Sequence, residues 1–204
     1  MKTSPDRAGR YSVRFDDGSS MRLYRQTLED FGLYTGMELT EDEFSRLKKA
    51  AGEMSAKMRA VRIVSAASVS RRDLQNRLIR KGEDPDQAGQ AVEWLSELHL
   101  LDDRNTAEQV VHSRIAKGYG MARAKQALYE KQIPREYWEE ALAEYPDQTE
   151  AITGFLRSRL TDPSDSRAKK RAIDALLRRG HSYQAIRQAL SRLSVDMDDF
   201  PEEA

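Results

Sequence analysis

The side chains that could carry acid–base or metal chemistry are few and scattered in this sequence of 204 residues. The three histidines, His99, His112 and His181, are far apart, and neither HExxH nor GxSxG is present. The paired carboxylate Asp102-Asp103 is of a type that binds metals or transfers protons. Because it directly precedes a predicted helix, we interpret it as a helix cap. The sequence therefore predicts a protein with no catalytic residues, no metal and no cofactor.

Basic side chains follow a clearer pattern, although the totals conceal it. The chain has 34 lysines and arginines and 34 aspartates and glutamates, and a net charge of zero argues against a nucleic-acid partner. Three helical segments, however, together hold fourteen basic residues and only three acidic ones. The helices predicted to follow the first and second of these segments are acidic, and so are the residues after Leu193. The predicted partner- or DNA-binding residues are Arg71, Arg72, Arg77, Arg80, Lys81, Arg123, Lys125, Lys131, Arg167, Lys169, Lys170, Arg171, Arg178 and Arg179.

This recurrence has two interpretations. Any single lysine or arginine is more simply the solvated face of an amphipathic helix. The threefold recurrence on one type of helix favours a basic stripe that binds phosphates or an acidic protein surface. The bases are densest in the first and third segments, and the second has a more balanced charge. Tyr119 and Tyr129 lie near the stripe and are candidates for base stacking, with packing as the simpler role.

The elements that must position these residues form an internal repeat. When Leu78, Leu128 and Leu176 are aligned, fifty and then forty-eight residues apart, apolar positions before and after them also coincide. Each copy reads as three short helices, the second ending near glycine or, in the second copy, at Gln132. The fold class that this predicts is mainly α, an elongated array of three tandem three-helix repeats. An ordinary helical bundle with accidental similarity is the alternative.

A different pattern precedes the repeats. Tyr11, Val13 and Phe15 alternate with polar residues, and alternation resumes at Met21 after the turn at Asp17-Gly18, which predicts a β-hairpin. A third short strand is predicted near residues 38–39, and Thr40 begins a capping box. The predicted organisation is a leader with a hairpin and a short helix (1–52), repeats at 53–101, 102–146 and 147–193, and an acidic, disordered tail (194–204).

Composition narrows the function classes. The chain has no cysteine, which excludes disulfides and thiolate metal sites. No apolar run approaches the roughly 18 residues of a membrane span, and the N-terminus has no apolar signal segment. We therefore expect a cytoplasmic monomer that does not bind a membrane.

Several of these segments resemble the RecX family of regulators of the RecA recombinase. The resemblance depends on SRRDLQNRLIRKG, on the L-x-L-L-D-D junction at Leu98–Asp103, and on the helix with Val110, Val111 and Arg114 that leads to Gly118-x-Gly120. It covers roughly residues 54–193, and the leader is similar to that of some members. Gln132 departs from the family pattern, which has glycine there. The order and spacing of the motifs carry the resemblance, since each motif alone is weakly specific.

The resemblance implies a function that composition could not give. RecX proteins bind the filament of RecA and DNA along its groove and modulate, mostly by inhibition, its ATPase, strand exchange and coprotease activities, without an active site. It implies the RecA filament as partner, with single- or double-stranded DNA bound more weakly alone. Two alternatives stay open: a DNA-binding protein of helix-turn-helix-like modules that acts without RecA, and an interaction scaffold unrelated to DNA.

Overall fold

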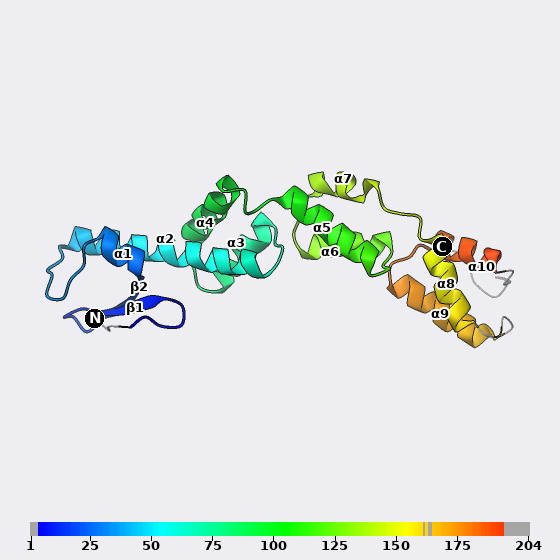
Figure 1. The fold of residues 1–204 in the computed structure, drawn as a ribbon, viewed down its shortest axis with the longest axis horizontal. Coiled ribbons are helices and arrows are strands. Elements are labelled where there is room, and N and C mark those ends of the chain that lie inside the picture. Colours follow the sequence, from blue (N-terminus) through cyan, green and yellow to red (C-terminus); the bar gives the residue numbers. More distant parts are fainter. Residues whose placement is uncertain (1–3, 161, 163–164, 194–204) are drawn as a thin grey trace. The chain divides into compact units, whose positions relative to one another are not determined.

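The chain folds as a series of helices preceded by one small β-hairpin, which confirms the predicted mainly α fold class (Figure 1). This computed structural model describes residues 4–160, 162 and 165–193. It divides into two compact units, Met1–Asp102 and Asp103–Ala204. The predicted acidic tail at 194–204 lies outside the described residues.

The hairpin consists of β1 (Arg10–Arg14) and β2 (Ser20–Tyr24), paired antiparallel with Tyr11 opposite Leu23. Gly18 supplies the left-handed turn, with φ +83°. β2 continues directly into α1 (Arg25–Asp30), whereas the pattern predicted the helix of the leader only after Thr40. The third strand predicted near residues 38–39 was wrong: this segment is a loop, and Leu39 packs its side chain against the leader core without joining the sheet.

Helix α2 (Glu41–Ala66) connects the leader to the first three-helix set. Its predicted capping box is present: Thr40 Oγ1 accepts from Glu43 N at 3.3 Å, and Thr40 N donates to Glu43 Oε2 at 2.9 Å. The helix runs without a break across the predicted boundary at residue 52. Leu47 therefore packs with the hairpin core, while Ala56 and Ala60 belong to the next core.

That next core is built by α2 with α3 (Arg71–Arg80) and α4 (Pro85–Glu97). Ser70 caps α3, and Asp84 caps α4 ahead of its first-turn proline. Glu83, only 8% exposed, joins the turn between these helices to α2. Its carboxylate accepts from Arg59 Nε at 2.6 Å and from Ser55 Oγ at 3.1 Å.

The second unit contains two further sets of helices, each with its own core. One set consists of α5 (Asp103–Ala116), α6 (Met121–Glu130), the short 3-10 helix η1 (Arg135–Tyr137) and α7 (Trp138–Ala143). The other consists of α8 (Thr149–Arg159), α9 (Ser166–Arg178) and α10 (Tyr183–Arg192). Figure 1 shows these helices following one another in chain order. The three aligned leucines, Leu78, Leu128 and Leu176, are each at most 1% exposed in their own cores.

The second helix of each set ends in the same way. The carbonyl of the aligned leucine accepts from the nitrogen five residues later, at 3.1 Å in α3 and α6 and 3.2 Å in α9. The residue immediately before that nitrogen has a left-handed backbone conformation: Gly82 (φ 87°), Gln132 (φ 54°) and Gly180 (φ 85°). Gln132 therefore forms the same helix cap that glycine forms in the other two sets. Its backbone is strained there, because a residue with a Cβ disfavours the left-handed conformation.

A candidate basic interface

The predicted basic residues lie on α3, α6 and α9 or at the C-caps of these helices. On α3, Arg71, Arg72 and Arg80 are exposed, as is Lys81 at its end. Arg77 is half-buried and forms a salt bridge with buried Asp73, at 2.8 Å from Nη2 to Oδ2 and 2.9 Å from Nε to Oδ1. Its charge is largely neutralised, so Arg77 serves the fold of α3 more than a binding surface.

On α9, Arg167, Lys170, Arg171 and Arg178 are exposed. Lys169 is not, since only 6% of it is accessible. The structure thus places Lys169 on the packed side of α9 and removes it from the accessible set. A run of charged letters in a sequence does not reveal which side chain turns inward.

On α6, Arg123 and Lys125 are exposed, and Lys131 is half-buried at the C-cap. Arg123 donates from Nε to the Arg178 carbonyl at 3.1 Å, so it already joins the second set of helices to the third. Tyr129 is 65% exposed on α6, whereas Tyr119 is half-buried in the loop before it.

The start of α6 meets the end of α9 through main-chain contacts. Gly120 N donates to the Arg179 carbonyl at 2.9 Å, and Ala122 N donates to the Gly180 carbonyl at 3.3 Å. A Cβ on Gly120 would overlap the Gly180 carbonyl, and a Cβ on Gly180 would lie 2.5 Å from Arg123 N. Both glycines are therefore required for the two helices to approach so closely.

Two side chains extend this contact to the loop between α5 and α6. Arg179 donates from Nη2 to the Lys117 carbonyl at 3.2 Å, and His181 Nε2 lies 3.2 Å from the Gly118 oxygen. Burial lowers the pKa of His181, and the charge of Arg179 acts in the same direction against the opposing hydrogen bond to Gly118. His181 is thus a packed junction residue, not a proton-transfer group in an open site.

Arginine and aromatic side chains alternate across this junction. The guanidinium carbons of Arg114 and Arg179 each lie 5.7 Å from the centre of the Tyr119 ring. Those of Arg179 and Arg159 lie 5.8 Å and 5.6 Å from the centre of the Phe155 ring. We call these five side chains the arginine–aromatic ladder: Arg114, Tyr119, Arg179, Phe155 and Arg159.

Sequence reasoning selected Arg179 and Tyr119 but missed the other members of the ladder. A signal was present, because Arg62, Arg114 and Arg159 occupy similar places near the ends of the first helices of the three sets. In the first set the role differs: Arg62 donates from Nη2 to the Tyr24 hydroxyl at 2.6 Å and so binds the leader.

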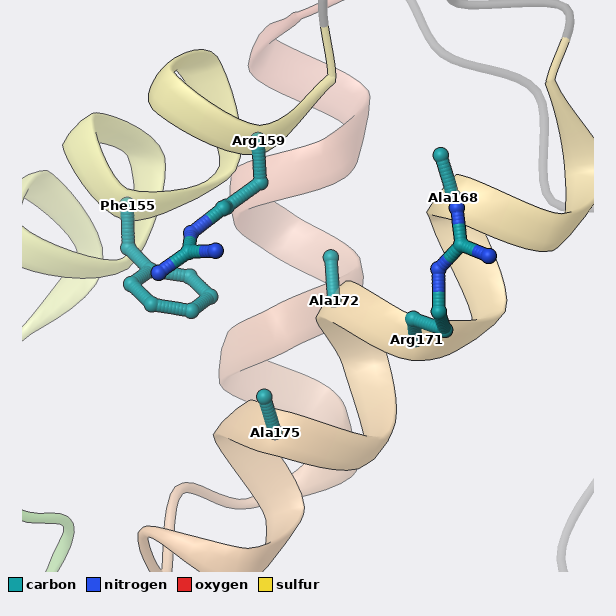
Figure 2. A pocket seen from close by; sticks show the side chains of 6 residues that line it. All are labelled: Phe155, Arg159, Ala168, Arg171, Ala172 and Ala175. Carbon is teal, nitrogen blue, oxygen red and sulfur yellow. The ribbon is translucent and has the colours of Figure 1, made fainter.

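A shallow hollow lies at each end of the ladder. The one between α8 and α9 has a volume of about 300 Å³ and is lined by Phe155, Arg159, Arg171 and three alanines (Figure 2). The other, about 170 Å³, is bordered by Arg114, Tyr119, Arg123 and Glu130. Among the described residues, none of Arg114, Arg123, Arg159, Arg171 and the ladder residue Arg179 forms an ion pair with a carboxylate. The hollow beside Phe155 is therefore bordered by positive charge alone, whereas the hollow beside Tyr119 also has Glu130 on its border.

Other chemistry has little support in the described part of the chain. It contains no cluster of three or more histidine, aspartate or glutamate side chains that could hold a metal ion. No helix among residues 4–160 and 165–193 is long and apolar enough to cross a membrane.

The fold is that of a modular helical protein, whose sets of three helices each carry exposed basic side chains. Residues 102–142 match the family model described as RecX, second three-helix domain. The chain is 31% identical over 140 residues to the regulatory protein RecX of Xanthomonas axonopodis pv. citri, which covers 67% of this chain and 86% of the relative. It is also 31% identical over 154 residues to that of Halorhodospira halophila, covering 73% and 94%. The chain belongs to the RecX family of regulatory proteins.

Solved structures show the same fold. A crystal structure of a regulatory protein RecX aligns with a TM-score of 0.63 and 21% identity, over 92% of this chain and 96% of the other. The RecX structure from Lactobacillus salivarius gives the same TM-score at 23% identity, over 72% and 99%.

Proposed function

We propose that this protein binds the filament that RecA forms on DNA, lies along its groove and modulates the filament, mostly by inhibition of ATP hydrolysis, strand exchange and coprotease activity. Membership of the RecX family gives the class of regulator. The observation that carries the proposal in this chain is the recurrence of exposed bases on α3, α6 and α9, which supply positive charge to a polyanionic partner.

The proposal includes the organisation of the chain. It acts as a cytoplasmic monomer and as a binding protein without an active site. The units that contact the filament are the repeats at 53–101, 102–146 and 147–193, and the leader at 1–52 supports the first of them through α2. DNA alone is a weaker ligand than the filament, in keeping with the net charge of zero.

The experiment is a titration of this protein into RecA hydrolysing ATP on single-stranded DNA. Inhibition at substoichiometric amounts, together with capture of RecA that requires DNA and nucleotide, is the expected result. Tight DNA binding without RecA, and no effect on RecA, would instead favour independent helix-turn-helix-like modules. Indifference to both DNA and RecA would leave an interaction scaffold.

A further inference from the structure

We propose that the arginine–aromatic ladder and the hollow beside Phe155 form a binding site for one nucleotide of a single strand of nucleic acid. The arginines hold the phosphates, and the base enters the hollow between α8 and α9. This inference rests on the proposed function and deepens it, since it names which part of the basic surface contacts the strand and in which form.

The ladder holds its guanidinium groups close to aromatic rings. A guanidinium that lies against an aromatic ring uses its flat face for the contact and keeps its N–H groups for hydrogen bonds at the edge. The guanidinium carbons of Arg114, Arg179 and Arg159 lie 5.6–5.8 Å from the centres of the Tyr119 and Phe155 rings, within the range of a cation–π contact. One Arg179 nitrogen is used by the Lys117 carbonyl, which anchors that side chain further. Such preordered donors lose little freedom when they bind an oxyanion.

Among the residues that the structure describes, no carboxylate neutralises the charge of these arginines. Arg77 shows the contrast, because its guanidinium is occupied by Asp73. In the described residues Arg114, Arg159 and Arg179 have no carboxylate partner, and neither does Arg171 beside the hollow. Several unpaired cations close together match a ligand with closely spaced negative charges, as in a phosphodiester chain.

The hollow next to the ladder is partly apolar, so a phosphate group alone would not fill it. Figure 2 shows Ala172 and Ala175 of α9 opposite Phe155 and Arg159 of α8, with Arg171 further along the rim. Alanine and phenylalanine make an apolar floor, and two arginines border it. A flat apolar body that carries an adjacent anion fits this combination, and a nucleotide has both parts. An acidic peptide offers carboxylates without the flat body, and a duplex keeps its bases stacked inside.

The test uses the full chain without RecA. Fluorescence anisotropy measures the binding of a labelled single-stranded oligonucleotide and of an abasic strand of equal length, over a series of salt concentrations. The site variant is Arg159→Ala with Arg171→Ala. The matched control is Arg157→Ala with Arg187→Ala, which removes the same charge from exposed positions on α8 and α10. Circular dichroism checks that all variants fold.

We expect the wild type to bind the base-containing strand at least about fivefold more tightly than the abasic strand. The site variant loses this difference, binds the strand at least about fivefold more weakly and reduces the salt slope by roughly 1.4, as expected for two lost phosphate contacts. The control variant stays within about twofold of the wild type.

Three results would overturn the proposal. The first is equal weakening of strand binding in both double variants, and the second is equal binding of the base-containing and abasic strands. The third is an acidic peptide that binds more tightly than the strand and whose binding is lost in the site variant. DNA-dependent capture of RecA is measured in parallel. If capture persists while the strand results fail, the nucleotide site is wrong and the proposed function stands. If capture fails as well, both are wrong.

Discussion

The main chains of Gly120 and Arg179 are joined by a hydrogen bond of 2.9 Å from the nitrogen of one to the carbonyl of the other. This bond links the first turn of α6 to the end of α9, and Gly180, the next residue, lies against Arg123. The second and third sets of helices thus meet through backbone at this point, which leaves no room for a side chain at position 120 or 180.

Replacement of Gly180 by alanine should therefore lower the stability of the second unit by more than the backbone strain of a left-handed alanine alone. We expect a loss of about 2–4 kcal/mol, of which about 1–2 kcal/mol is conformational strain and the rest overlap with Arg123. Native-state hydrogen exchange of the amides in α6 and α9 measures it. Gly82→Ala is the control, because Gly82 has φ +87° and no atom within 4 Å of a Cβ. Equal losses in the two variants would show that the α6–α9 contact contributes nothing.

His181 predicts a dependence of stability on pH. Because burial lowers its pKa in the folded state, the unfolded chain takes up the proton first, near the ordinary histidine pKa of 6.5. The free energy of unfolding should fall as the pH is lowered through that value, and the loss should end below the folded pKa. Urea unfolding between pH 8 and 5 measures the slope.

The variant His181→Gln should flatten that slope while it keeps a nitrogen donor for the Gly118 carbonyl. His112→Gln changes an exposed histidine on α5 and should leave the slope as it is. A slope that survives in His181→Gln would assign the pH dependence to other groups.

The ion pair between Glu83 and Arg59 should contribute to the fold of the first set of helices. Glu83→Ala leaves the Arg59 charge, itself about one-third exposed, without its carboxylate, and we expect a loss of about 2–3 kcal/mol in thermal or chemical unfolding. Asp42→Ala breaks an exposed pair with Arg46 on the same α2 helix and should cost less than about 1 kcal/mol. A similar cost for both variants would contradict the structural role of Glu83.

Much of the fold could be predicted from the sequence because its signals are local. The hairpin at Asp17-Gly18, the capping box at Thr40 and the aligned leucines all express short-range patterns, and each has its expected place in the structure. Helix α1 was missed, since six residues without a side-chain cap give no clear period. The loop at residues 38–39 carries alternating residues that tertiary packing places outside a strand.

The site was less predictable for a physical reason. Periodicity identifies the helix on which a base lies, but not its partners across the fold. Lys169 is buried, Arg77 is paired with Asp73, and Arg159 joins the ladder only because α8 brings it to Phe155 near Arg179. Phe155 and Arg159 are four residues apart on α8, but Arg114 and Arg179 are 65 residues apart in sequence, so no local pattern relates the two ends of the ladder.

The central claim is that exposed bases on the second helices bind the RecA filament. The direct measurement is ATP hydrolysis by RecA on single-stranded DNA, titrated with the wild type and with a variant carrying Arg72→Ala, Arg80→Ala, Lys170→Ala and Arg171→Ala. A control with Lys48→Ala, Lys49→Ala, Arg157→Ala and Arg187→Ala removes equal charge from other exposed positions. We predict inhibition by the wild type and the control, and at least about tenfold more protein for half-inhibition by the variant. Full inhibition by the variant at the wild-type concentration would contradict the claim.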